Sequence, residues 1–178
     1  MDPRLKQMID DLTAAAMKDL SEGKFFPSIL LIGTLRNHIL PIYIPRSEEF
    51  FRDDASKEAM RPGVAYIWNL CQKHNRLDKL LAVVVFADAY FQTKPLGEMP
   101  PEMEGDDPHY PEGYLRPSQD PESKEALIVA TSMADSYTTS THTYVTVNGK
   151  MEFTYDKGMS ESTSFTGRLY NLFPPSAK

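Results

Sequence analysis

The sequence lacks several features on which whole classes of protein depend. It contains a single cysteine, Cys71, which excludes both an internal disulfide framework and a cysteine-based zinc cluster. Its longest apolar run, residues 80–87, is far shorter than the roughly 20 residues that a membrane-spanning helix needs. The first residues carry no apolar segment of the kind found in secretory signals. We therefore expect a cytoplasmic protein that contacts no membrane, with Cys71 as an inert core thiol.

The common signatures of catalysis are also missing. The chain has no glycine-rich phosphate-binding loop, no H-E-x-x-H metal helix and no G-x-S-x-G nucleophile turn. The four histidines, His38, His74, His109 and His142, are scattered, and none pairs with another at a metal-ligand spacing. We therefore expect neither a metal nor a cofactor. Because enzymes can lack all of these motifs, their absence favours a non-enzymatic protein without excluding catalysis.

The negative charge is confined to one segment. Residues 93–123 hold eight acidic and two basic side chains, which accounts for the whole net charge of −6 and leaves the rest of the chain neutral. A neutral body has no excess lysine or arginine to displace counterions from a phosphate backbone, so nucleic acid is not an expected partner. The segment also carries seven of the fourteen prolines, and so long a loop is typically functional or disordered. Its run Asp106-Asp107-Pro108-His109 lacks the spacing of a metal motif, and we interpret it as solvated surface.

The first half of the chain alternates between helical and strand patterns. Apolar residues at helical spacing predict a helix over 3–20, with Asp2 as its cap. The apolar runs 28–33 and 38–44 predict a hairpin, whose second strand is demoted to an edge or a bulge by Pro41. A second helical stretch is expected from Ser47. Pro62-Gly63 should interrupt it, and a fresh helix should run from there to about His74, with Trp68 and Cys71 on its buried stripe.

The second half of the chain has the residue patterns of β-strands. Residues 80–91 include a continuous apolar, β-branched run, which is typical of a central strand covered on both faces. Another strand is expected over 125–133. Asn148-Gly149, between residues 141–147 and 150–156, predicts a two-residue type I′ hairpin turn. That turn pairs Val147 with Lys150, so Met151, Phe153 and Tyr155 fall opposite Thr146, Tyr144 and His142. This face is the more apolar one, and we place it toward the core.

The order of these elements predicts the fold class. We expect one α+β domain over 1–178, with a mostly antiparallel sheet of about five to six strands and two or three helices packed on one face. The acidic, proline-rich loop at 93–123 interrupts this domain. The Ser/Thr-rich tail at 157–178 includes several aromatic and aliphatic residues, so it is expected to dock on its own body or on a partner.

Four of these residues are candidates for a site. Asp88, near the end of a buried strand, would have a raised pKa if unpaired, as general acids often have. His142, beside Tyr155 and near Tyr144 on the expected core face, could bind a ligand or shuttle protons. Each also has a plainer interpretation. Asp88 could accept hydrogen bonds from a turn or an arginine, and His142 could be a satisfied cross-strand partner.

Three stretches carry a resemblance to known proteins. They are the helix that contains Trp68, the strand V-V-V-F-A-D-A-Y-F over 83–91, and R-P-S-Q-D-P-E-S-K-E-A-L from Arg116 to Leu127. Together they resemble a loose group of uncharacterised bacterial and phage proteins, in which R-P-S-x-D-P precedes a strand that begins E-A-L or E-A-V. The resemblance covers about residues 25–156 and implies a similar fold, but no activity and no site residues. Separately, Arg116 is a candidate binding residue because it could return to pair with Asp88 or Glu125.

Two functional hypotheses follow. The first is a cytoplasmic, non-enzymatic binding or accessory module that acts through contact with a protein partner or a second copy of itself. The missing catalytic signatures, the strand edge near Pro41 and the acidic loop favour it, because proline lowers the ordering cost when a loop engages a partner. The alternative is a small hydrolase or isomerase that uses acid–base chemistry from Asp88 and His142, which requires both side chains to converge in one pocket.

Overall fold

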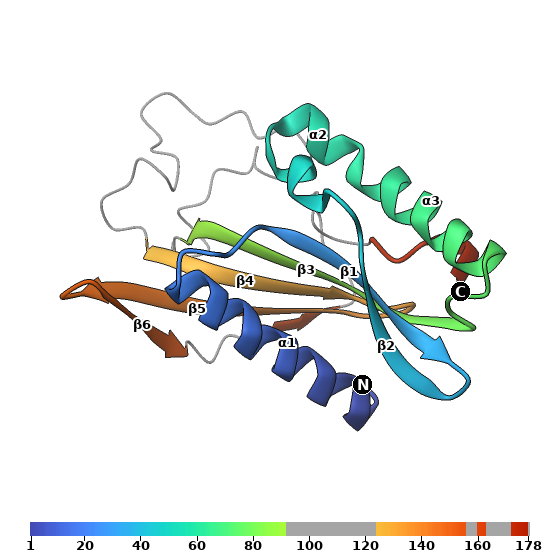
Figure 1. Ribbon diagram of the computed structural model, residues 1–178, viewed down its shortest axis with the longest axis horizontal. Helices are drawn as coiled ribbons and strands as arrows, with labels where there is room; N and C mark the ends of the chain where they lie inside the picture. Colours follow the sequence, from blue (N-terminus) through green and yellow to red (C-terminus); the bar gives the residue numbers. More distant parts are fainter. Residues whose placement is uncertain (92–123, 156–159, 163–171, 178) are drawn as a thin grey trace.

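The computed structural model describes residues 1–91, 124–155, 160–162 and 172–177, and its centre is a curled antiparallel sheet (Figure 1). The elements, in chain order, are α1 (Pro3–Ser21), β1 (Ser28–Leu35), β2 (His38–Tyr43), η1 (Ser47–Phe51), α2 (Asp54–Glu58), α3 (Met60–Lys73), β3 (Lys79–Phe91), β4 (Lys124–Ser132), β5 (Tyr137–Val147), β6 (Lys150–Tyr155), β7 (Ser160–Ser162) and η4 (Pro175–Ala177). The strand order is β2-β1-β3-β4-β5-β6, and β7 also pairs with β5. Every described pairing is antiparallel, as the α+β prediction requires.

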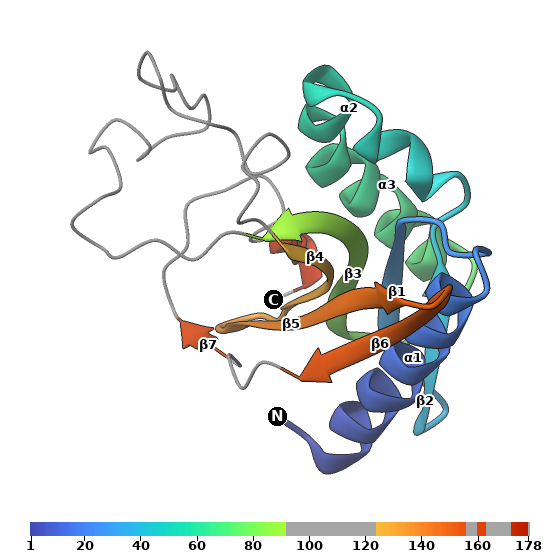
Figure 2. The ribbon, with the colours of Figure 1, turned by 90° about the vertical axis from the view of Figure 1, so that its left-hand side faces the viewer.

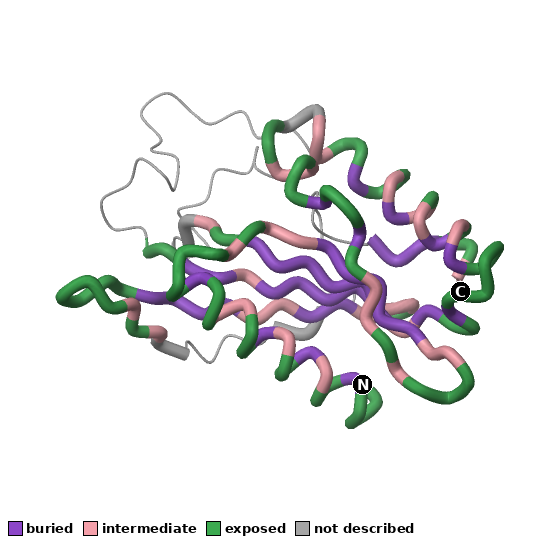
Figure 3. Tube along the Cα trace, viewed as in Figure 1, coloured by how far each residue is buried: buried purple, intermediate pink, exposed green. Residues whose placement is uncertain are grey.

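Helices cover both faces of this sheet, so the prediction that they pack on one face is not confirmed. Along β1, Ile29 and Leu31 join the core under α3, whereas Leu30 and Ile32 join the core under α1. Consecutive side chains of a strand point to opposite faces, so one continuous apolar run can serve both layers. Figure 2 shows α1 and α3 on opposite sides of the sheet. Burial is deepest in the strands between them (Figure 3).

The first helix follows the local signals in the sequence. The Asp2 carboxylate accepts a hydrogen bond from the Arg4 backbone N–H at 2.8 Å, and Pro3 occupies the first turn, where no intrahelical donor is needed. Leu5, Ile9 and Leu20 are buried along one stripe, which packs against the sheet. The predicted helix is therefore confirmed, and it lies across the face of the sheet that also carries Tyr144.

The region after β2 forms two short helical pieces, followed by the longer helix α3. Ser47–Phe51 is a 3₁₀ helix, Asp54–Glu58 is a single turn capped by Asp53, and α3 begins at Met60. Pro62 was expected to break a helix, but it lies in the first turn of α3, where the backbone N–H groups have no partner within the helix. Trp68 and Cys71 are buried on this helix as predicted, and burial raises the pKa of the Cys71 thiol, which keeps it protonated.

Pro41 lies on the edge strand β2, as its missing donor predicts. The Ile44 N–H donates to the Ile29 carbonyl at 2.9 Å, so alternate pairs along β1 and β2 are hydrogen-bonded. Pro41 pairs with Ile32, which is one of the pairs that are not hydrogen-bonded. The backbone N and carbonyl of Pro41 therefore point away from β1. The proline therefore costs the ladder no hydrogen bond. It removes an outward donor and so makes the edge a poorer template for a further strand.

The hairpin of β5 and β6 has the predicted register. Asn148 and Gly149 have φ values of 52° and 75°, as a type I′ turn requires. Val147 pairs with Lys150, and the pairing continues outward to Tyr144 with Phe153. The rings of Tyr144 and Phe153 lie 5.4 Å apart between centroids, and Tyr144 is buried in the core under α1. The more apolar face therefore points inward, as expected.

The end of the chain docks on the body, in agreement with the expectation for the tail. Leu172 and Phe173 are buried in the core that contains Trp68, and the Leu172 N–H donates to Ser132 Oγ at 3.3 Å. The acidic loop predicted at 93–123 lies outside the described residues. Within the described part of the chain, no helix is long and apolar enough to cross a membrane.

Candidate functional site

Asp88 and His142 lie on the same face of the sheet but on different strands. Asp88 pairs with Leu127 of β4, Leu127 pairs with His142 of β5, and His142 pairs with Tyr155 of β6. Directly paired residues share a face, so this row runs across the face that α1 covers. One strand separates Asp88 from His142, which places their backbones about 9.6 Å apart. The two candidate acid–base groups are therefore not in direct contact.

Asp88 is not the buried, unpaired carboxylate that was considered from the sequence. The side chain is exposed, and its Oδ1 accepts a hydrogen bond from the Tyr144 hydroxyl at 2.8 Å. Asp88 lies three residues before the end of β3 at Phe91. The burial inferred from the apolar run ends at Ala87. Asp88 therefore anchors Tyr144 rather than facing an enclosed space.

His142 is buried at 7% exposure, and its Nε2 lies 3.2 Å from Ser140 Oγ. Ser140 precedes it by two positions on the same face of β5. Burial lowers the pKa of His142 below the usual value, because removing the ring from water penalises its charged form. The imidazole is therefore neutral at physiological pH and acts as a hydrogen-bonding group rather than as a charge.

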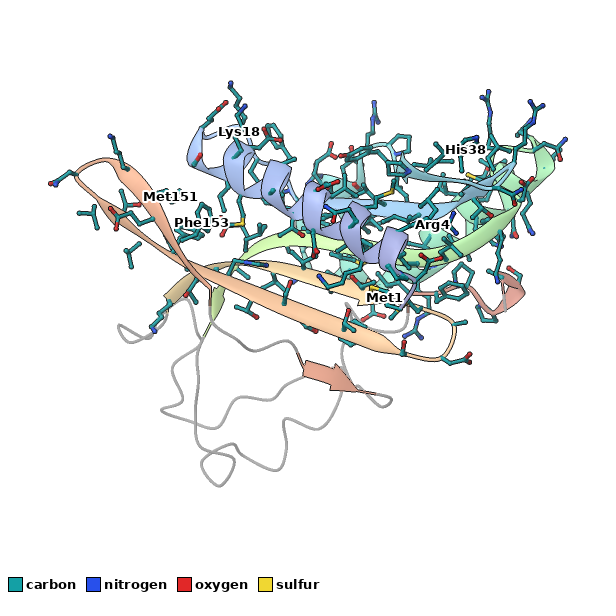
Figure 4. The ribbon with its side chains drawn as sticks, turned by 90° about the horizontal axis from the view of Figure 1, so that it is seen from below. Met1, Arg4, Lys18, His38, Met151 and Phe153 are labelled. Atoms are coloured by element: carbon teal, nitrogen blue, oxygen red, sulfur yellow. The ribbon has the colours of Figure 1, made fainter. Side chains whose placement is uncertain are left out.

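His142 and Ser140 line a cavity between α1 and the sheet, here called the α1–β5 cavity. It has a volume of about 320 Å³. Its lining comprises Met1, Lys6, Ile9, Asp10, Thr13, Ala14, Met17, Val129, Thr131, Thr138, Ser140, His142 and Phe153. Figure 4 shows Met1 at one end of α1 and Phe153 on β6 toward the other end, which agrees with a groove that follows the helix. Asp88 and Tyr144 do not line it.

The sheet side of the α1–β5 cavity is a polar stripe. Thr138, Ser140 and His142 are alternate residues of β5, and Thr131 of β4 pairs with Thr138. Thr131, Thr138 and His142 are all buried. The helix side is mixed, with apolar Ile9 and Met17 together with polar groups. A concave, partly apolar lining with a few convergent hydrogen-bonding groups is typical of small-molecule sites.

The two charged side chains of this lining have opposite signs. Lys6 and Asp10 are its charged side chains, and Lys6 Nζ lies 2.6 Å from Asp10 Oδ2, one helical turn away. Both are more than half exposed, so they mark the solvent side of the cavity. The described side chains of the lining therefore carry no net charge.

A second hollow lies on the same face, at the other end of α1. It has a volume of about 260 Å³, and its lining includes Phe25, Phe26, Tyr43 and Phe86. Phe26 is 72% exposed and Tyr43 is 59% exposed. Exposed aromatic side chains beside a hollow are typical of protein contact surfaces.

Sequence reasoning found His142 but missed most of its surroundings. The run T-T-S-T-H over 138–142 places a polar residue at every second position on the His142 face, and the Asn-Gly register extends to these residues. That register could have identified Thr138 and Ser140. The helix that covers them could not be identified from β5 alone. Of the other candidates, Tyr144 contacts Asp88 and Phe153. Arg116 and the Tyr155 side chain lie outside the described residues.

No protein family, curated protein or solved structure matches the chain. These comparisons therefore assign no family to the chain, and they do not test the resemblance to bacterial and phage proteins. Among the described residues, no group of three or more histidine, cysteine or acidic side chains could hold a metal ion. The run Asp106-Asp107-Pro108-His109 lies outside them.

Proposed function

We propose that the chain is a non-catalytic binding module whose binding site is the α1–β5 cavity. The observation that carries this proposal is the cavity itself, about 320 Å³ in volume, with buried His142 and half-buried Ser140 in hydrogen-bond range on its floor. Its volume lies at the lower end of the range usual for ligand sites. The ligand would therefore be a small molecule or one short segment of a larger one.

The mixed lining supports binding over simple packing. A cavity between a helix and a sheet normally closes with apolar side chains, because dense packing of the interior stabilises the fold. Here threonine, serine and histidine occupy the α1-facing positions of β5 where apolar side chains would serve a core. Polar groups in such a position orient an occupant through hydrogen bonds.

The alternative of an acid–base enzyme requires Asp88 and His142 in one pocket. Only His142 lines the α1–β5 cavity, and Asp88 is exposed and bonded to Tyr144. General acid–base catalysis needs both groups within hydrogen-bond reach of one substrate. The positions of Asp88 and His142 therefore do not support their action as an acid–base pair.

A second candidate function is contact with a protein partner, as expected from the sequence. The exposed rings of Phe26 and Tyr43 beside the second hollow favour it. Such rings contribute much of the binding energy at protein interfaces when they become buried. A partner with apolar side chains would cover them.

Two matched variants on α1 separate these candidates. Ala14 lines the α1–β5 cavity and Ala15 lines the second hollow, and both are exposed. The assay is fluorescence titration with uncharged N-phenyl-1-naphthylamine and anionic 8-anilinonaphthalene-1-sulfonate. We expect at least one probe to bind, Ala14→Trp to weaken its binding at least tenfold, and Ala15→Trp to leave it within about twofold. If neither probe binds, or if only Ala15→Trp weakens binding, the α1–β5 cavity is not the ligand site.

A further inference from the structure

The two walls of the α1–β5 cavity differ in composition. Lys6 and Met17 mark the two ends of the helix wall, and the eleven residue steps between them rise about 16 Å. Along this length Ile9 and Met17 provide apolar surface, and Phe153 closes the side of β6. The opposite wall carries the hydroxyl groups and the imidazole of β5. An occupant would therefore have an apolar body with its polar atoms on the side facing the sheet.

A charged occupant would be poorly compensated in this cavity. Lys6 Nζ and Asp10 Oδ2 lie 2.6 Å apart, and both side chains are more than half exposed on the solvent side. The floor offers hydroxyl groups and a buried imidazole, and no charged side chain of the lining lies among them. Moving a charge from water to such a place costs several kcal/mol unless an opposite charge meets it. An uncharged polar group avoids this cost.

The floor has one natural anchor for an uncharged polar group. His142 Nε2 and Ser140 Oγ lie 3.2 Å apart and point from the same face of β5. A serine hydroxyl has one donor and two acceptor positions, so a hydroxyl that is bonded once can still bond to a second group. A ligand hydroxyl or amide placed there would join this pair and extend it to a short network.

On these grounds we propose that the α1–β5 cavity takes a small uncharged molecule, with an apolar body and a hydrogen-bonding group that Ser140 and His142 hold. This inference rests on the proposed function, because it names the class of ligand for the same cavity. It goes further by excluding carboxylate, phosphate and ammonium ligands as preferred occupants.

Four naphthalenes test this inference at pH 7.5. They share one apolar body and differ in one substituent: 2-naphthol and naphthalene are uncharged, 2-naphthoate is an anion and 2-naphthylmethylamine is a cation. Equilibrium dialysis against the full chain gives their dissociation constants. We expect 2-naphthol to bind at least tenfold more tightly than either charged compound, and several-fold more tightly than naphthalene.

Ser140→Ala supplies the residue-level test, with Thr139→Ala as the matched control, because Thr139 is its neighbour on the opposite face of β5. We expect Ser140→Ala to weaken 2-naphthol about fivefold and to leave naphthalene unchanged, and Thr139→Ala to change neither. Equal or tighter binding of a charged compound would overturn the inference while leaving the proposed cavity in place. An unchanged 2-naphthol affinity in Ser140→Ala would overturn the proposed anchor. If no naphthalene and neither fluorescent probe binds, the proposed function fails as well.

Discussion

Replacing Gly33 with alanine would place a methyl group against the backbone of a neighbouring strand. A Cβ at this position would lie 2.5 Å from the Lys79 carbonyl oxygen and 2.9 Å from Leu77 Cδ1. The pairing of β1 with β3 shifts register between Ile32 and Gly33, so the two backbones approach closely at this point. Lys79 belongs to the backbone of β3, and a backbone carbonyl cannot turn aside as a side chain can. The strands must therefore separate locally.

The expected cost follows from what that separation breaks. Overpacking a well-filled core costs about 1–3 kcal/mol. The Asp78 N–H donates to the Thr34 carbonyl at 2.6 Å next to the bulge, and a weakened hydrogen bond of this kind adds about 0.5–1.5 kcal/mol. We therefore expect Gly33→Ala to lower the free energy of unfolding by about 1.5–4.5 kcal/mol.

Gly63→Ala is the matched control for this prediction. Its Cβ would also make a short contact, 2.7 Å, but with Cζ of the half-buried Phe50 side chain, which can turn away. Alanine in a helix gains about 1 kcal/mol over glycine, which offsets that rearrangement. We expect the free energy of unfolding of Gly63→Ala to stay within about 1 kcal/mol of that of the parent chain.

Urea unfolding measures both variants, with the fluorescence of Trp68 as the signal, because Trp68 is the single tryptophan and is 2% exposed. The dependence on urea concentration should keep its slope, which shows that the unfolded states are comparable. The reasoning is wrong if Gly33→Ala costs less than about 0.5 kcal/mol, or if the two variants cost the same.

Three further predictions concern buried polar groups. Tyr144→Phe removes the hydrogen bond to Asp88 Oδ1 and should cost about 0.5–1.5 kcal/mol in urea unfolding, with Asp88→Asn reducing the effect in a double-mutant cycle. The pKa of His142 is lower in the folded chain than in the unfolded chain. As the pH falls, the imidazole is therefore protonated in the unfolded chain before it is protonated in the folded chain. Stability should therefore drop as the pH falls below about 6.5, and His142→Gln should flatten this dependence in urea midpoints measured from pH 7.5 to 5.5. Trp68 Nε1 is buried without a hydrogen-bond partner among the described residues. Trp68→Phe should therefore change the free energy of unfolding by less than about 1 kcal/mol in thermal unfolding, whereas Trp68→Ala should cost about 3–5 kcal/mol.

Each of these predictions has a contrary outcome. A coupling energy near zero between Tyr144 and Asp88 would mean that their hydrogen bond contributes nothing to stability. Lys6 and Asp10 also line the cavity beside His142, so an equal pH dependence in His142→Gln would assign it to groups other than the imidazole. A loss in Trp68→Phe as large as that in Trp68→Ala would show that the indole N–H is satisfied.

Much of the local structure could be predicted because its causes lie within a few residues of one another. Asp2 and Pro3 start α1, and Asn148-Gly149 imposes the register that places Tyr144 opposite Phe153. Pro62 was misjudged, because proline breaks a helix interior but suits its first turn, and the start of α3 at Met60 was not evident from the pattern.

The site itself could be predicted only in part. The apolar run of β1 shows that this strand is buried on both faces, but no local pattern states which helix covers which face. The α1–β5 cavity brings Lys6 and Met17 next to residues 138–142, more than a hundred positions later in the chain. The hydrogen bond from Tyr144 to Asp88 spans 56 positions. Such contacts depend on how separate layers pack.

Short-range physics thus accounts for α1, the Asn148-Gly149 turn and the register of β5 with β6. Caps, turn dihedrals and the two-residue period of a strand act over a few residues and need no knowledge of the rest of the chain. Packing of α1 and α3 on opposite faces, the exposure of Asp88 and the enclosure of His142 arise only in the folded sheet. Burial is a property of what lies opposite a side chain, and the covering element comes from a distant part of the sequence.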